Sequence, residues 1–323
     1  MVEAAPASYE SITVIYNHRK GAEHHAEEIR ERLQDTQDAP VNLLQTVKGG
    51  SEANAELFDA KLQPGTEIAV RGGEGTWRDT IGALLLEGME ELNGQVSVTS
   101  LNQRGKKDKN NKDEEAASNA CDIGKSLHGR LDDPALIFGT GLRAVTAYAL
   151  EGSVVTLTGD KSKGIAGSYI GFGHSALGSG RVNTDEYKKK NSLRRDLEIV
   201  AGTLLGKHTF TIIDQQGAEH TLSELSINKG EWMAKYARFD VRHWDEEFRV
   251  TPVTPGRLRA TYTAVQLLFG NATGENRETP LHFRTSTPAY IHFDGEPPQK
   301  IPSWSTVHIG LHPRSYTVLT TKL

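Results

Sequence analysis

The segment Gly72–Thr76, with the sequence GGEGT, combines three glycines, an acid and a hydroxyl one residue after the apolar run Ile68–Val70. Glycines tolerate positive φ and let the backbone approach a ligand closely, so main-chain N–H groups can reach phosphate oxygens. The Thr76 hydroxyl can either cap the helix expected over 77–87 or bond a phosphate oxygen. The pattern predicts an anion-binding loop between a strand and a helix, and the alternative is a tight turn without a ligand.

The elements around this loop predict a parallel sheet that holds it in place. Apolar and β-branched runs alternate with segments whose apolar residues recur every three or four positions, as at Ala26, Ile29 and Leu33. Parallel sheets bind ligands at the carboxyl ends of their strands, where the glycine loop lies. The expected elements are strands over 11–16, 41–44, 68–70 and 95–101 and helices over 22–33, 51–62 (capped by Ser51), 77–87 and 116–127.

The pattern changes at about residue 154, where short alternating runs separated by turns are typical of an antiparallel, β-rich domain. We therefore predict an α/β domain over 1–150 and a β-rich domain over 151–312, and leave open whether 313–323 returns to the first domain. The strands of the second domain are expected at 154–157, 169–170, 210–213, 257–268, 290–293 and 306–311, with one helix over 191–205.

Composition narrows the class of protein. A net charge of −5 over 323 residues disfavours nucleic-acid binding. Cys121 is the only cysteine, which excludes an internal disulfide and a cysteine-based zinc site. The amino terminus lacks the pattern of a signal peptide, and no apolar stretch is long enough to span a bilayer. We expect a cytoplasmic protein that meets lipid only at a membrane surface.

Two segments are rich in basic residues. The segment 103–115 contains no apolar residue, and 188–195 combines three lysines with two arginines. Both are expected to be solvated surface, and the alternative is contact with anionic lipid.

Five stretches, in order along the chain, resemble motifs of the diacylglycerol kinase catalytic family, which includes bacterial lipid kinases and sphingosine kinases and is related to NAD kinases. The GGEGT loop is similar to the family's GGDGT signature. The other four stretches are Asn17–Gly21 (first-strand loop), Asn119–Gly124 (G-N-D-F-A), Tyr169–Gly173 (G-x-G-F) and Asp294–Pro297 (D-G-E). Val307–Pro313 also resembles the strand that closes the family's chains.

The resemblance implies a fold and a reaction. The fold is a three-layer α/β domain followed by a β-rich domain, with the active site in the cleft between them. The reaction transfers the γ-phosphoryl of ATP, with Mg²⁺, to a lipid hydroxyl such as that of diacylglycerol at a membrane surface. Such chemistry needs donors for the phosphate oxygens, a metal to neutralise charge and a base at the hydroxyl.

Carried over residue by residue, the resemblance makes Asp294 the general base and gives Glu74 a catalytic place at the glycine loop. It places Asp122 and Asp245 near the metal. The residues implied to line the nucleotide are Asn17, Gly72, Gly73, Glu74, Gly75, Thr76, Arg78, Asn119, Asp122 and Glu296.

Departures from the family pattern keep alternatives open. Glu74 replaces an aspartate, Cys121 an asparagine, and Arg78 stands where the family commonly has asparagine. Arg78 can clamp a phosphate or pair with Asp79. The run 139–142, GTGL, competes with 119–124 as the second nucleotide loop, because it follows the apolar run 135–138.

These departures leave two alternatives to a lipid kinase: a nucleotide-binding regulatory protein without turnover, and a kinase of a soluble hydroxyl compound such as NAD. Whether the protein forms a homodimer is also open.

Overall fold

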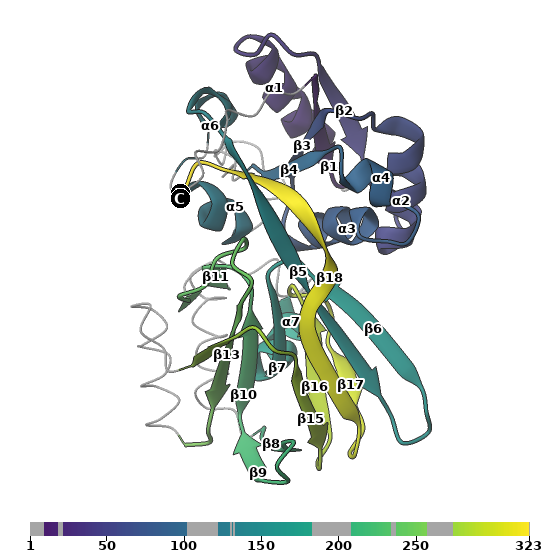
Figure 1. The fold of residues 1–323 in the computed structure, drawn as a ribbon, viewed down its shortest axis with the longest axis vertical. Helices are drawn as coiled ribbons and strands as arrows, with labels where there is room; N and C mark the ends of the chain where they lie inside the picture. The colour runs from purple at the N-terminus through teal and green to yellow at the C-terminus, as the bar shows by residue number, and fades with distance from the viewer. Residues whose placement is uncertain are drawn as a thin grey trace. The chain divides into compact units, whose positions relative to one another are not determined.

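The computed structural model describes residues 10–18, 22–101, 122–129, 131, 133–182, 208–233, 237–256 and 274–322. The predictions for 103–115, 188–195, 191–205 and 257–268 fall outside these residues. The chain divides into two compact units, Met1–Tyr148 with Pro313–Leu323, and Ala149–His312. Two long strands, β5 (Arg143–Val155) and β18 (Thr306–Thr320), pass from one unit to the other (Figure 1).

The first unit contains a parallel sheet with the strand order β2-β1-β3-β4-β18. Its strands β1 to β4 are Ser11–Tyr16, Val41–Gln45, Thr66–Arg71 and Ser97–Ser100. Its helices α1 to α6 are Ala22–Gln34, Gly50–Lys61, Glu74–Leu84, Glu90–Asn93, Asp122–His128 and Pro134–Gly139.

Helices cover this sheet on both faces, as a three-layer domain requires (Figure 1). The predicted stripe of Ala26, Ile29 and Leu33 on α1 is fully buried and shares a core cluster with β1 and α6. Helix α3 packs against α2 and contributes the fully buried Trp77 and Ile81. The predicted α/β class of this unit is confirmed.

The second unit is a β-sandwich, which confirms the predicted β-rich class. One sheet is antiparallel throughout, in the order β14-β13-β10-β7-β16-β17, and residues of β5, β8, β15 and β18 close the same core from the other side. The elements are β6 (Lys161–Ala166), β7 (Tyr169–Gly173), α7 (His174–Val182), β8 (Phe210–Ile213), β9 (Glu219–Leu222), β10 (Glu224–Asn228), β11 (Trp232–Met233), β12 (Ala237–Arg238), β13 (Phe248–Val253), β14 (Glu275–Arg277), β15 (Leu281–Thr285), β16 (Ala289–Phe293) and β17 (Gln299–Ile301).

The predicted caps of α2 and α3 are wrong. Gly49 and Gly73 hold the N-cap positions, and neither cap has a side-chain hydrogen bond. Both helices begin earlier than predicted, so Ser51 and Thr76 lie inside the first turn, where their backbone is already helical. None of the helices in the described ranges is long and apolar enough to cross a membrane.

The aromatic ring of Phe293 fills the space above two glycines in the second unit. Gly152 and Gly164 face each other across the β5–β6 pair. A methyl group on either would lie 2.9 Å from a ring atom of Phe293. The ring therefore sits where the hairpin has no side chains, at the end of the strand that leads into Asp294.

Substitution of Gly164 by Ala is expected to lower the free energy of unfolding by about 2 kcal/mol, because Phe293 must move to admit the methyl group. Chemical denaturation measures this change. The matched control, Gly178→Ala in α7, has no atom within 4 Å of the added methyl and should be neutral or slightly stabilising. Equal stability of the two variants would contradict the packing described.

Candidate functional site

Two predicted site segments lie at the same edge of the parallel sheet. Tyr16 and Arg71 are direct partners where β1 and β3 end, so Asn17 and Gly72 follow paired residues. Because β2 lies on the other side of β1, the connection from β2 to β3 crosses over β1. The strand order therefore reverses between β1 and β3, which is where open α/β sheets bind ligands.

Helix α3 starts at this edge with backbone donors and no side-chain cap. Its N-cap, Gly73, is extended (φ −91°, ψ −171°), and Glu74 is the first helical residue. The first turn of a helix has N–H groups without intrahelical partners, and the helix dipole favours an anion there. This geometry is suited to a phosphate group.

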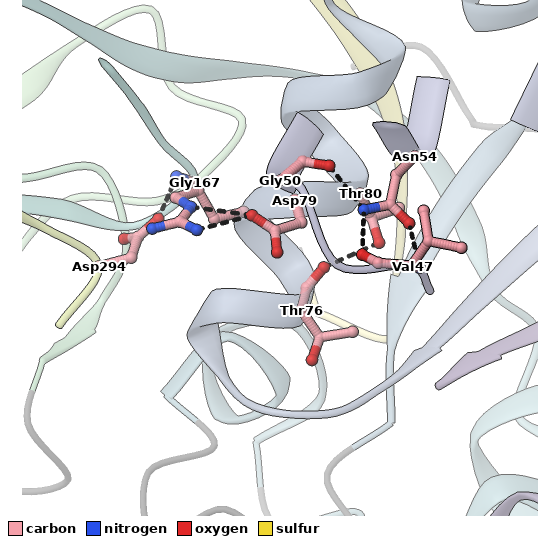
Figure 2. A network of polar contacts seen from close by, with 9 residues as sticks. Val47, Gly50, Asn54, Thr76, Asp79, Thr80, Gly167 and Asp294 are labelled. Carbon is pink, nitrogen blue, oxygen red and sulfur yellow. Dashed lines mark hydrogen bonds and ion pairs between the residues drawn. The ribbon is translucent and has the colours of Figure 1, made fainter. Parts of the chain in front are cut away.

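Close packing inside the loop requires glycine at position 72. A methyl group on Gly72 would lie 2.3 Å from Thr76 Oγ1 and 2.5 Å from Thr76 Cβ. The Thr76 side chain is buried beneath the loop. The backbone carbonyl oxygen of Thr76 accepts a 2.8 Å hydrogen bond from Thr80 Oγ1 (Figure 2). The loop thus packs closely on the first turn of the helix it precedes.

Arg78 pairs with its neighbour. Its Nε and Nη2 donate to Asp79 Oδ1 at 3.2 and 2.7 Å. This is one of the two alternatives that the sequence left open, and the pairing holds the guanidinium on the first turns of α3. A role for Arg78 toward phosphate stays a prediction.

A third loop at the same edge was missed by the sequence reasoning. It follows β2 over residues 46–49, and fully buried Asn54 holds it and the first residue of α2 (Figure 2). Asn54 accepts from the Val47 N–H at 3.0 Å and donates to the carbonyls of Val47 and Gly50 at 3.2 and 2.7 Å. The double glycine after a strand was the signal that could have revealed this loop.

Asp294, in the second unit, is a buried carboxylate that binds three backbone amides. Its Oδ2 accepts from the Gly167 N–H at 2.6 Å (Figure 2). Its Oδ1 accepts from Ser168 and Tyr169 at 3.0 and 2.9 Å. These bonds join the turn after β16 to the segment before β7. Its role as a base is a separate matter and stays a prediction, as does the nucleotide contact of Glu296.

The metal predictions find no cluster to support them. Asp245 Oδ2 accepts from the Arg242 N–H at 2.9 Å and so closes a turn. Within the described ranges, no three His, Cys, Asp or Glu side chains converge as a metal site would require. Asp122 begins α5, but its side chain, like Asn119, is outside the described part of the chain.

The rival second loop at 139–142 loses its basis. The apolar run before it, Ala135–Phe138, belongs to helix α6 and not to a strand. A loop at the carboxyl end of a helix meets carbonyl oxygens and the negative end of the dipole, which do not favour phosphate.

A second buried carboxylate, Glu224, lies in the core of the second unit. Burial raises its pKa to about 7, although hydrogen bonds with Ser175 oppose the shift. Glu224 Oε2 accepts from the Ser175 N–H at 2.7 Å, and Ser175 Oγ lies 3.2 Å from His292 Nε2. Burial also lowers the pKa of His292 to about 3, so its ring is neutral. No sequence pattern marked this network.

The raised pKa of Glu224 predicts a pH dependence of stability. The pKa is 4.5 in the unfolded chain and about 7 when folded, so stability present below pH 4.5 is lost as pH rises to 7. The unfolding free energy of the protein, relative to Glu224→Gln, should fall by roughly 3 kcal/mol across that window and stay level above it. Urea titrations between pH 4 and 8 test this, and parallel curves for both proteins would refute it.

Asp294→Asn should destabilise the second unit by about 3 kcal/mol, because one amide oxygen cannot serve three buried N–H donors. Urea unfolding compares it with Asp240→Asn at an exposed position, which should change little. If Asp294→Asn is as stable as this control, the three hydrogen bonds do not hold the turn. Loss of activity in Asp294→Asn is therefore not by itself evidence for a base.

Comparisons with known proteins agree with this architecture at the level of the fold. No protein-family model matches the sequence. No curated protein matches it either. The solved structures that match include three from Bacillus anthracis strain Sterne, two of them provisionally named diacylglycerol kinase and one named a diacylglycerol kinase.

Each likeness covers 97% of this chain and 98% of the other, with TM-scores of 0.62, 0.63 and 0.58 and identities of 17%, 16% and 15%. At such identity the likeness establishes the fold and not the activity. The chain has the two-domain fold of these proteins.

Proposed function

We propose that the protein is an ATP- and Mg²⁺-dependent phosphotransferase that acts on a lipid hydroxyl, such as that of diacylglycerol, at a membrane surface. The observation that carries the proposal is the start of α3: a glycine loop and a helix without a side-chain cap at the reversal point of a parallel sheet. The likeness to structures named diacylglycerol kinase supports the class of acceptor.

The backbone N–H groups of Gly75 and Thr76 are proposed to hold the terminal phosphates of ATP, with Asn17 from the adjacent loop beside them. Such donors stabilise charge that grows on the phosphoryl group during transfer. Mg²⁺, when bound, neutralises charge on the phosphate oxygens. Glu74 and Asp122 are the carboxylates proposed to hold it.

Asp294 is proposed as the base. The bond from the γ-phosphorus to ADP breaks, a new bond forms to the acceptor oxygen, and the hydroxyl proton passes to the carboxylate.

A second function, nucleotide binding without turnover, is favoured by a specific observation. Three amide donors stabilise Asp294 as an anion and so oppose its acceptance of a proton. Under this alternative the glycine loop binds ATP as a regulatory ligand.

The nucleotide proposal predicts that Gly72→Ala weakens MgATP binding by about tenfold or more, because the methyl group collides with Thr76 and displaces the loop. A fluorescent ATP analogue measures affinity. Gly139→Ala, whose added methyl has nothing within 4 Å, is the control and should bind normally. Failure of the unmodified protein to bind MgATP would refute the proposal.

Turnover separates the two functions. Purified protein with labelled ATP is given vesicles containing diacylglycerol, vesicles without it, or NAD in solution. Labelled lipid only with diacylglycerol supports the kinase. Binding of MgATP with no labelled product in any mixture supports the regulatory alternative, and labelled NAD would replace the lipid with a soluble acceptor.

A further inference from the structure

A buried lysine lies among backbone carbonyls in the second unit. Lys229 follows β10 directly and has no solvent exposure. Its Nζ donates to the carbonyl oxygens of Arg242 at 3.3 Å and Glu247 at 2.8 Å, and also to that of Asp245. All three acceptors belong to the segment 242–247, which leads into β13.

Three carbonyl oxygens that converge on one point form the kind of oxygen cage that proteins use for hard cations. Three consecutive acids, Asp245, Glu246 and Glu247, add negative charge to this segment. An ammonium has three N–H donors and no acceptor, which matches the three carbonyl oxygens that surround it.

Asp245 shapes the cage through both its side chain and its backbone. Its Oδ2 accepts from the Arg242 N–H at 2.9 Å, and its own N–H donates to the Arg242 carbonyl at 3.2 Å. These two bonds fold 242–245 into a closed turn whose carbonyls are directed at the lysine.

Lys229 also connects the cage to Asp294. Its backbone N–H donates to the Ser168 carbonyl at 2.7 Å, and the Ser168 N–H donates to Asp294 Oδ1 at 3.0 Å. One residue thus links segment 242–247 to the segment that holds the Asp294 turn.

We propose that segment 242–247 is a cation site whose occupant is the ammonium group of Lys229, in the position where a divalent metal would otherwise bind beside Asp245. The site needs no metal in this protein, and removal of the ammonium turns it into a site for Ca²⁺ or Mg²⁺.

The test is Lys229→Ala, which removes the ammonium and leaves the carbonyls. Thermal unfolding is measured with 10 mM CaCl₂, 10 mM MgCl₂ or EDTA. The variant should have a lower Tm than the unmodified protein in EDTA and regain about 3 °C or more with a divalent cation. The unmodified protein and the exposed control Lys300→Ala should show no such gain. Isothermal titration should find one Ca²⁺ per chain of Lys229→Ala and none after Asp245→Asn is added.

Several outcomes overturn the proposal. The proposal is wrong if cations raise the Tm of Lys229→Ala no more than they raise that of Lys300→Ala. It is also wrong if the unmodified protein binds a divalent ion that Asp245→Asn no longer binds. Lys229→Met fills the space with an apolar chain and should gain nothing from cations. If Lys229→Ala is recovered unfolded, refolding from urea with and without CaCl₂ decides: recovery only with the cation supports the site, and equal failure refutes it.

Discussion

A charged carboxylate is stable inside a β-sandwich only where enough donors surround it, and Asp294 meets that requirement with three consecutive amides. The same short segment supplies the carbonyl of Ser168 to Lys229, whose ammonium in turn gathers the carbonyls of 242–247. The Asp294 carboxylate accepts from backbone N–H groups, and the Lys229 ammonium donates to backbone C=O groups. Together they complete the hydrogen bonding of three turns. The core of the second unit depends on this arrangement, because unpaired backbone groups would otherwise be buried at each turn.

In the first unit, too, a few side chains fix several turns. At the edge where β1, β2 and β3 end, glycines let the chain turn sharply, and Asn54 and Thr76 secure the turns from below. Helix α3 then begins with backbone N–H groups and without a side-chain cap.

The sequence predicts the local features that are marked by a periodic pattern or by glycine. It found the parallel strands, the buried stripe of α1 and the β-rich character of the second half, because periodicity and glycine report them directly. It misplaced the caps at Ser51 and Thr76, because the glycines before them allow each helix to begin earlier. It treated 135–138 as the kind of run that precedes a phosphate loop, since a short apolar run does not distinguish strand from helix.

The polar contacts could not be predicted from the sequence. Asp294 meets its donors across more than 120 residues, and Lys229 is one lysine among many until the turn at 242–247 is placed around it. Nothing in the sequence of α2 marks Asn54 as a buried residue. Such contacts arise from topology, which one sequence pattern does not contain.

The donors to Asp294 belong to the main chain, and this bears on how the protein can diverge. Every residue type except proline carries the N–H that the carboxylate needs, so the donors do not depend on which side chains stand at positions 167–169. Packing of the buried Ser168 and Tyr169 limits the side chains at those two positions, and a proline at any of the three positions is the substitution that would remove a donor.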